Sequence, residues 1–568
     1  MDAPVSPLAR RAGSPWAALG LFFGLAVVAT WPLLPGLGKD VPGDYGDPLF
    51  VAWAMAWVAH RLGGALTGDL DALLGFWDAN QLHPEPGTLA LSDHFIAQAV
   101  PLAPVYWLTG NPLLVLGLAY LAAYVLCGFC TWLLVREVTG SAAAGVLAGC
   151  TFAFNPFFLV WELSHLQVIS AWGMPLALYG LRRYFERGSR AGLWTGAAGI
   201  VLLNLSAGYY MLMFPMFVLL YAGWEITSRG WWGRARMWRD LLAAGTGAIL
   251  ATAPFVWPYA QAQRRLGFAR SVDETTQMAA AVEGYIAGME PLIIPFAFAG
   301  LALMAAAVMR MGRARRSMPL LGFATAGATL AFWLSLGPAP SWGGEVYPAL
   351  GLYGLLQEHV PGMDALRVTS RFGIVFLLFL GVLAGMGGAL VARLPMAAPL
   401  VAALGVWSML MNAPVSFPLN QPLAPTLDVR PPAPYLTPGG APPDVYRYLS
   451  SLPSSTVVAE LPFTDLWYNT RYLYFSTFHW HPLVNGFTSF FPPAYTERAR
   501  WLVNPVRTPD EAWRALESGQ ATHVVVHTDA WDAAYVQELD RWLTTRGALS
   551  HGDFGGARVY QVPPPRAR

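Results

Sequence analysis

The sequence predicts a polytopic α-helical membrane protein with about eleven transmembrane helices, followed by a soluble C-terminal α/β domain. Composition provides two of the observations behind this fold class. Apolar residues make up 55% of the 568 residues and charged residues only 12%, about half of the ~25% typical of soluble domains. Such a chain could not cover a water-soluble fold with charged side chains, which excludes a soluble enzyme and a disordered chain. The net charge of +1 gives no field that would attract nucleic acid.

The third observation is that the apolar residues fall into long runs, which locate the membrane spans. A helix rises about 1.5 Å per residue, so about 20 apolar residues cross a bilayer. No clear small-residue cleavage site follows the first run, so we interpret it as a helix rather than a signal peptide. The predicted spans lie near residues 16–35, 112–135, 142–160, 167–181, 191–204, 207–225, 240–257, 291–309, 318–336, 372–392 and 395–412.

Arginine placement predicts the orientation, because short cytoplasmic loops carry an excess of Arg and Lys. Arg10 and Arg11 precede the first span, and the later loops on the same side are short and rich in arginine. Those loops contain Arg136, Arg182, Arg183, Arg187, Arg190, Arg229, Arg234, Arg236, Arg239, Arg310, Arg313, Arg315, Arg316 and Arg393. We therefore expect a protein of the bacterial inner membrane with a cytoplasmic N-terminus. The long connections, which hold all 10 histidines, then face the periplasm, and any active site is expected there.

The chain divides into three predicted regions. Residues 1–412 form the transmembrane domain, with a long first periplasmic loop at 36–111. Residues 413–442 form a Pro-rich linker, and residues 443–568 form a periplasmic α/β domain. In this domain we expect helices at 443–452, 509–518 and 530–546, and strands at 456–460, 523–526 and 557–562. It contains no GxGxxG, P-loop or HExxH motif, so nothing indicates a nucleotide or zinc site.

The first periplasmic loop carries the clearest chemical signal. Asp44 and Asp47 lie a few residues beyond the first span, in the sequence Gly43-Asp44-Tyr45-Gly46-Asp47-Pro48. A carboxylate there could accept the proton of an attacking hydroxyl, and a pair could hold a divalent cation against a phosphate. The alternative is a turn in which either Asp caps the next helix. The apolar run Leu49–Val58 that follows is expected to be too short to span and to lie in the interface.

These features together resemble the GT-C glycosyltransferase superfamily, which includes protein O-mannosyltransferases, lipid A aminoarabinose transferases and oligosaccharyltransferases. The resemblance is carried by the many spans, the soluble C-terminal domain and the segments Asp44–Val58, Ser92-Asp93-His94, Ser164-His165-Leu166-Gln167 and Leu366–Phe372. It implies an inverting transferase that moves a sugar from a polyprenyl-phosphate donor to a glycan, lipid or protein acceptor at the periplasmic face. The catalytic base would be Asp44 or Asp47. The usual Asp-Glu pair of the family is absent, which leaves the choice between the two open.

The donor phosphate would need cationic partners on the same side of the membrane. Arg264, Arg265, Arg367 and Arg371 are the candidates, because guanidinium binds phosphate bidentately and stays charged near lipid. Arg367 and Arg371 are four residues apart and are expected to share one helix face before the tenth span. The alternative for each arginine is an interface anchor or a carboxylate partner, such as Asp273, Glu274 or Glu283 for the first two.

Further substrate-binding candidates are Asp93, His94, Glu162 and His165. His94 and His165 could instead be hydrogen-bonded structural residues, and Glu162 could instead pair with a nearby arginine. Asp44, Asp47, Asp93 and His94 could hold a divalent metal, but members of the superfamily differ in metal use, so no cofactor is assigned. The aromatic stretch from Asp465 to Arg471 suits sugar stacking, or alternatively packing onto the membrane domain.

Two other classes of function fit the same composition. A transporter or flippase of lipid-linked glycans would carry ionisable residues near the bilayer midplane, and such residues are nearly absent from the predicted spans. A non-catalytic assembly protein would depend on neither aspartate.

Overall fold

The computed structural model describes residues 13–288, 292–309, 318–424, 427–432 and 442–564. These residues form two compact units. Unit 1 comprises Met1–Leu34, Tyr120–Val256 and Phe268–Phe417, and unit 2 comprises Pro35–Ala119, Trp257–Gly267 and Pro418–Arg568. The predicted cytoplasmic arginines of segments 1–12 and 310–317 lie outside the described residues.

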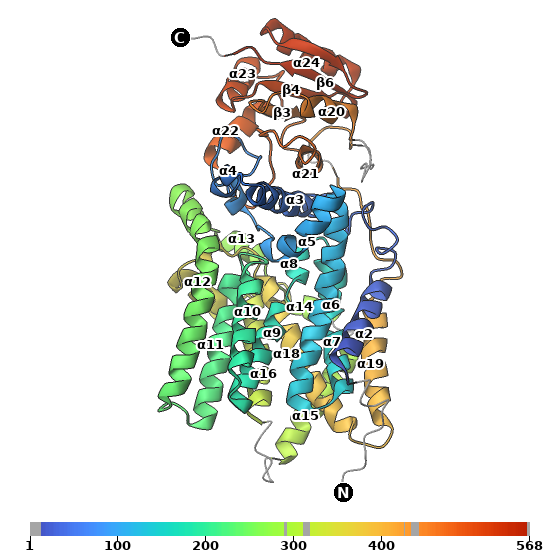
Figure 1. Cartoon of the computed structure of the whole chain (residues 1–568), viewed down its shortest axis with the longest axis vertical. Helices are drawn as coiled ribbons and strands as arrows, with labels where there is room; N and C mark the ends of the chain where they lie inside the picture. Colours follow the sequence, from blue (N-terminus) through green and yellow to red (C-terminus); the bar gives the residue numbers. More distant parts are fainter. Residues whose placement is uncertain (1–12, 289–291, 310–317, 425–426, 433–441, 565–568) are drawn as a thin grey trace. The chain divides into compact units, whose positions relative to one another are not determined.

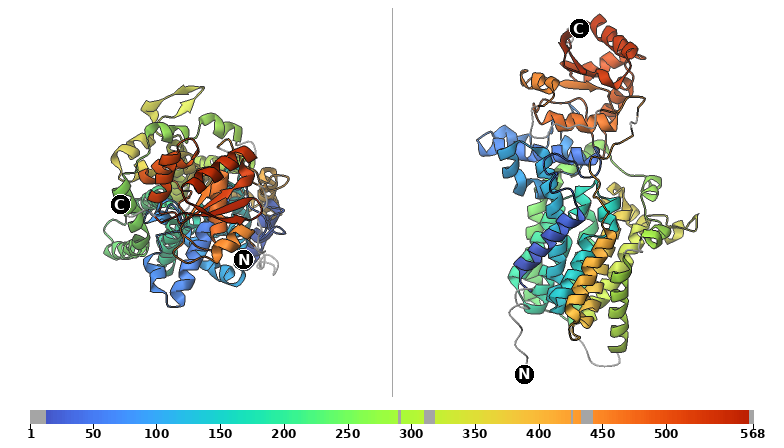
Figure 2. Two further views of the ribbon diagram at one scale, coloured as in Figure 1. Left: turned by 90° about the horizontal axis from the view of Figure 1, so that it is seen from above. Right: turned by 90° about the vertical axis from the view of Figure 1, so that its right-hand side faces the viewer.

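Unit 1 is a bundle of apolar helices that run alongside one another (Figures 1 and 2). Helix α18 (Gly373–Val391) forms its centre, since nearly all of its side chains are buried against α7, α15 and α16. Helices α9 and α10 pack backbone to backbone, because a Cβ on Gly180 would overlap the backbone of Gly196. The other helices of ten or more residues described in this unit are α2 (Pro15–Ala29), α7 (Ala142–Ala153), α9 (Gly173–Arg187), α10 (Arg190–Asn204), α11 (Tyr210–Arg229), α15 (Ile293–Met309), α16 (Met318–Ser335) and α19 (Ala397–Asn412), with parts of α6 (Pro112–Thr139) and α12 (Ala235–Leu266).

Every one of the predicted spans contains a helix. The fourth is interrupted, because α8 (Leu166–Ile169) ends before α9 begins at Gly173. Among the described residues, 6 helices are long and apolar enough to cross a membrane. They are Asp47–Leu66, Pro112–Thr139, Ala142–Trp161, Tyr210–Arg229, Ala235–Leu266 and Thr369–Val391. The chain is therefore a multi-pass helical membrane protein.

One of these six corrects the sequence analysis. The run Leu49–Val58 was expected to be too short to span, yet it belongs to α3 (Asp47–Leu66), a helix of 20 residues. The helix continues past the polar His60 and Arg61 because the Arg61 guanidinium lies over the Trp57 ring, 5.1 Å from its centroid, and donates to the Asp71 carbonyl at 2.7 Å. An ionisable residue therefore did not mark the end of the apolar helix.

Unit 2 joins the first long loop to the C-terminal segment. Helix α3 lies between α5 (Ile96–Thr109) and α21 (Leu466–Ser476) (Figure 1), and its side chains from Pro48 to Ala59 are all buried. A four-stranded sheet of order β3-β4-β6-β5 pairs β3 (Val458–Leu461) in parallel with β4 (His523–His527). Strands β6 (Ala557–Gln561) and β5 (Leu549–Asp553) continue it in antiparallel fashion. The remaining helices are α4 (Leu70–Leu74), α20 (Asp444–Ser450), α22 (Pro493–Leu502), α23 (Pro509–Ser518) and α24 (Ala533–Thr545).

The six elements expected between residues 443 and 562 are all present, each within a few residues of its predicted bounds. The sequence analysis missed α21, α22 and β5. Helix α21 has the sequence LWYNTRYLYFS, and all but its first side chain are buried, so it shows no polar face that would reveal a helical period. Its one helix signal is the cap, where the Asp465 carboxylate accepts the amides of Trp467 and Tyr468 at 3.0 and 3.3 Å.

Candidate functional site

In unit 1, an ion pair joins the ends of two apolar helices. Glu162 follows a π-helical turn, Phe157–Trp161, and Arg371 lies in the 3-10 turn Thr369–Phe372 that leads into α18. The Arg371 guanidinium donates to Glu162 Oε2 at 3.2 Å, and His165 Nδ1 lies 3.0 Å from the same oxygen. Arg371 also stacks over the Tyr209 ring, with 5.0 Å to its centroid. This cluster therefore brings three of the predicted substrate-binding residues together.

Electrostatics keep Glu162 ionised although it is buried. Burial by itself raises the pKa of this carboxyl, but the charge of Arg371 and the hydrogen bonds from His165 and Arg371 outweigh burial and lower the pKa to about 2. The alternative interpretation of Glu162, pairing with an arginine, is thus what the structure shows.

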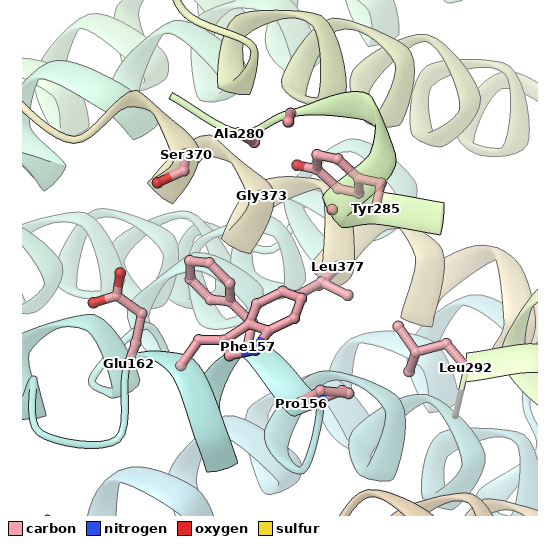
Figure 3. Close-up of a pocket in the computed structure, with 12 residues that line it drawn as sticks. Pro156, Phe157, Glu162, Ala280, Tyr285, Leu292, Ser370, Gly373 and Leu377 are labelled. Carbon is pink, nitrogen blue, oxygen red and sulfur yellow. The ribbon is translucent and has the colours of Figure 1, made fainter. Parts of the chain in front are cut away.

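Glu162 of this cluster also lines a pocket of about 260 Å³. Its walls are mostly apolar and come from the turn at 156–162, from helix α14 (Val282–Gly288) and from the start of α18. Figure 3 shows the Glu162 carboxylate at one end and Leu292 at the other, with Ser370 and the Tyr285 hydroxyl as further polar groups. The pocket can accept an apolar chain whose polar head lies at the Glu162 end.

Arg367 occupies a different position from the one predicted. It was expected to share a helix face with Arg371, but Arg367 precedes the 3-10 turn, and both neighbours, Leu366 and Val368, have non-helical backbone angles. The prediction of a common helix face was therefore wrong. Arg367 is exposed, and with burial it lowers the pKa of Arg270, whose guanidinium bonds Glu274 at 2.9 Å.

In unit 2, Asp44 and Asp47 occupy consecutive parts of one turn. The amide of Gly46 donates to Asp44 Oδ1 at 2.7 Å, and Asp47 is the first residue of α3, where a carboxylate is favoured by the helix dipole. Both side chains are half-buried. The structural alternative for the two aspartates was a turn that leads into a helix, and the structure contains such a turn. It leaves each carboxylate partly accessible.

The residue between the two aspartates is held by α21. Tyr45 is buried, its ring stacks on Trp467 with centroids 6.3 Å apart, and its carbonyl accepts the Thr470 hydroxyl at 2.8 Å. Burial raises the pKa of Tyr45, and the nearby Arg471 charge opposes this. Sequence reasoning selected the stretch Asp465–Arg471 for its aromatic residues but did not connect it to the aspartates.

His94 has a structural environment. Its ring lies between Trp77 and Tyr259, with centroids 5.8 and 5.9 Å away, and Nδ1 accepts the amide of Ile96 at 3.2 Å. Burial lowers the pKa of His94 to about 3, so the imidazole is neutral at physiological pH and offers no positive charge to a phosphate. The neighbouring Asp93 follows Ser92, whose carbonyl accepts the Tyr259 hydroxyl at 2.7 Å.

Arg264 and Arg265 end helix α12, and both are exposed. Arg264 lies 5.6 Å from the centroid of the Trp257 ring, and Arg265 donates to the Pro86 carbonyl at 2.8 Å. These contacts fix the two side chains near the first long loop, within unit 2. Over the part of the chain that the structure describes, no group of three His, Cys, Asp or Glu residues is arranged to hold a metal ion.

The predicted site residues are thus divided between the units. Unit 1 contains Glu162, His165, Arg367 and Arg371, and unit 2 contains Asp44, Asp47, Asp93, His94, Arg264 and Arg265.

Comparison with known proteins identifies the fold. No protein-family model and no curated protein sequence matches this chain. Among solved structures, the arabinofuranosyltransferase AftD from Mycobacteria has a TM-score of 0.57 and 14% identity, over 99% of this chain and 40% of AftD. ArnT from Cupriavidus metallidurans, bound to undecaprenyl phosphate, has a TM-score of 0.48 and 14% identity, over 96% of this chain and 98% of ArnT. The oligosaccharyltransferase AglB from Archaeoglobus fulgidus has a TM-score of 0.41 and 13% identity, over 98% of this chain and 75% of AglB.

The likeness to AftD shows that this chain shares the fold of that protein, and it confirms the predicted resemblance at the level of the fold alone. It spans about two fifths of the length of AftD, covering 40% of that protein.

Proposed function

We propose that this protein is an inverting membrane glycosyltransferase that moves a sugar from a polyprenyl-phosphate donor to an acceptor. It would act at the periplasmic face of the bacterial inner membrane, with the N-terminus in the cytoplasm and residues 443–568 in the periplasm. The observation that carries the proposal is the pocket of unit 1, which combines apolar walls with the buried Glu162 carboxylate at one end, and Glu162 is in turn paired with the half-buried Arg371. The shared fold with AftD, whose name describes an arabinofuranosyltransferase, supports the same class of reaction.

The pocket fits the chemistry of the donor in two respects. Phe157, Tyr285 and Leu377 present the apolar surface that an isoprenoid chain needs. A phosphate also requires a cation that remains charged beside lipid, and the proposed cation is Arg371, whose guanidinium bonds Glu162 and lies over the Tyr209 ring. As the sugar leaves, the guanidinium stabilises the negative charge that develops on the departing phosphate.

The proposed general base of the reaction is Asp44 or Asp47. The acceptor oxygen attacks the anomeric carbon, the bond from that carbon to the phosphate oxygen breaks, and the acceptor proton passes to Asp44 or Asp47. The lipid phosphate leaves with the bonding electron pair, so one displacement inverts the anomeric centre. Half-buried side chains suit this role, since they keep access for the acceptor.

A transfer assay in proteoliposomes tests the proposal. The purified full chain is given a polyprenyl-phosphate arabinofuranose, chosen because of the name of AftD, and then polyprenyl-phosphate mannose, with labelled membrane extract as acceptor source. Asp47→Asn and Asp44→Asn are compared with Asp69→Asn, which replaces the exposed Asp that caps α4 through a bond to the Ala72 amide at 3.2 Å.

We expect at least one of Asp44→Asn and Asp47→Asn to lose transfer by a factor of about 100 or more, within the range of general-base catalysis, and Asp69→Asn to keep it. Full transfer by the Asp44→Asn/Asp47→Asn double variant would show that neither carboxylate is the base. Movement of labelled lipid-linked glycan across the vesicle membrane without any transfer would instead favour a flippase.

A further inference from the structure

We propose that Thr470 and Asn420, in the C-terminal segment, are positioning residues that hold the Asp44–Asp47 turn in its reactive geometry. The inference rests on the proposed function, because it assigns these residues a role only if an aspartate of this turn is the base. Neither residue would touch the substrate. Each would act through the backbone of the turn, from a part of the chain more than 370 residues away.

The first observation is a short ladder between residues 41–44 and 418–421. The amide of Gly43 donates to the Pro418 carbonyl at 3.0 Å, and the amide of Gln421 donates to the Gly43 carbonyl at 2.8 Å. Asn420 adds two side-chain bonds, since its Oδ1 accepts the Val41 amide and its Nδ2 donates to Asp40, both at 2.9 Å. The residues that lead into the turn are therefore fixed on one side by the C-terminal segment.

The second observation is that α21 holds the middle of the turn from another direction. The Thr470 hydroxyl is fully buried, and the nearest of the carbonyls around it is that of Tyr45 at 2.8 Å; Leu466 and Trp467 in its own helix offer carbonyls at 3.0 and 3.3 Å. Trp467 stacks on the Tyr45 ring with an interplanar angle of 11°. Tyr45 is the residue directly after Asp44 and two before Asp47, so its peptide determines how both carboxylates are oriented.

Such support matters because proton transfer depends steeply on distance. A general base must lie within hydrogen-bond reach of the proton it removes, and a misplacement of about 1 Å can cost a factor of about 100 in rate. The Asp44 carboxylate accepts the Gly46 amide within the turn, so its position follows that of the turn backbone. A rigid backbone at Tyr45 therefore keeps the carboxylates of the turn in a fixed orientation, and neither Thr470 nor Asn420 needs to contact the substrate.

The test uses matched threonine variants of α21 in the full chain. Thr470→Val removes the donor and keeps the volume, Thr470→Ser keeps the donor, and Thr477→Val removes a buried hydroxyl that bonds only within the helix end, to Tyr474 at 2.7 Å. With the proteoliposome assay we expect Thr470→Val to lower kcat about tenfold, with the KM of donor and acceptor unchanged within a factor of about two. Thr470→Ser and Thr477→Val should keep kcat within the same factor of about two.

The outcomes separate a positioning role from a structural one. If Thr470→Val and Thr477→Val lower the melting temperature equally and leave kcat equal, Thr470 only stabilises the fold and the inference is overturned. If Thr470→Val does not fold, Asn420→Gly replaces it as the test. Asn420 has a φ of +53°, which glycine adopts without strain, so this variant removes the two side-chain bonds alone.

The Asp44→Asn/Asp47→Asn double variant is measured in the same assay. If it transfers at the wild-type rate, the proposed function fails and the positioning role fails with it. If it is inactive while Thr470→Val and Asn420→Gly both retain full kcat, the positioning role alone is refuted.

Discussion

Removing the guanidinium of Arg371 should destabilise the protein, because it leaves the Glu162 carboxylate, whose side chain is 11% exposed, without its main counter-charge. Burial raises the pKa of this carboxyl, and Arg371 and His165 together lower it from 4.5 to about 2. Because one pKa unit corresponds to 1.36 kcal/mol, this lowering is worth about 3 kcal/mol at neutral pH. Because the pKa of Glu162 is lower in the folded protein than in the unfolded chain, this contribution to folding stability is fully present at pH values above the unfolded pKa of 4.5. It is lost as the pH falls toward 2.

In Arg371→Met the burial of Glu162 remains while its main counter-charge is gone. We expect a loss of about 3 to 5 kcal/mol, the range for a buried pair broken by removal of one partner. Glu162→Gln should cost a similar amount, because Arg371 then lacks its carboxylate. The double variant should cost less than the sum of the two singles, since neither charge is left uncompensated.

Thermal unfolding of the purified full chain in detergent measures these losses. Arg270→Met is the matched control: Arg270 bonds Glu274 at 2.9 Å, but the Glu274 side chain is 34% exposed, so solvent screens the pair and a loss below about 1 kcal/mol is expected. The difference in unfolding free energy between wild type and Arg371→Met should also decrease as the pH falls from 7 toward 4. The reason is that the buried Glu162 carboxyl of the variant, which lacks its counter-charge, is protonated readily over this range. Additive losses, or a loss in Arg371→Met no larger than in Arg270→Met, would refute this reasoning.

Three further predictions concern the donor, the pH response and the topology. Arg367→Ala should raise the KM for the lipid-linked donor more than the KM for the acceptor, and equal effects would indicate a structural role instead. Burial lowers the pKa of His94 to about 3, so below pH 6.5 the unfolded chain binds a proton that the folded chain does not, and stability falls by about 1.4 kcal/mol per pH unit between 6.5 and 3. His94→Asn should make that fall shallower in a thermal-unfolding series, and an unchanged slope would contradict the assignment. Reporter fusions at Ser189 and at the C-terminus should report opposite sides of the membrane, and the same side for both would contradict the predicted orientation.

The helices of unit 1 could be predicted because apolar runs of the required length are a local property of the sequence. The same local reasoning failed where packing decides. Helix α3 extends beyond Val58 because Arg61 covers Trp57, and α21 is a helix because aromatic side chains on every face are buried. Arg367 does not lie on the expected helix face, because Leu366 and Val368 have non-helical backbone angles, which a spacing of four residues does not reveal.

The candidate site was predicted in part for the same reason. Residue type and chain position selected Glu162, Arg371 and Asp44, since charged groups at the ends of apolar helices need partners. The contact partners of these residues are distant in the sequence, so no local sequence pattern predicts them. Glu162 meets Arg371 across 209 residues of sequence, and the Tyr45 carbonyl meets Thr470 across 425.

The first long loop and the C-terminal segment, which differ in composition and position, are parts of one folding unit. The amides of Leu82 and His83 donate to the carbonyls of Asn485 and Leu483, both at 2.8 Å, and the amide of Leu483 donates back to the Asn80 carbonyl at 3.1 Å. Buried backbone groups that lose such partners cost about 1 to 3 kcal/mol each. Without the C-terminal segment the loop would therefore have to expose these groups to water or leave them unbonded. The half-buried aspartates belong to this shared structure, so their environment is a property of both ends of the chain and cannot be reproduced by the loop alone.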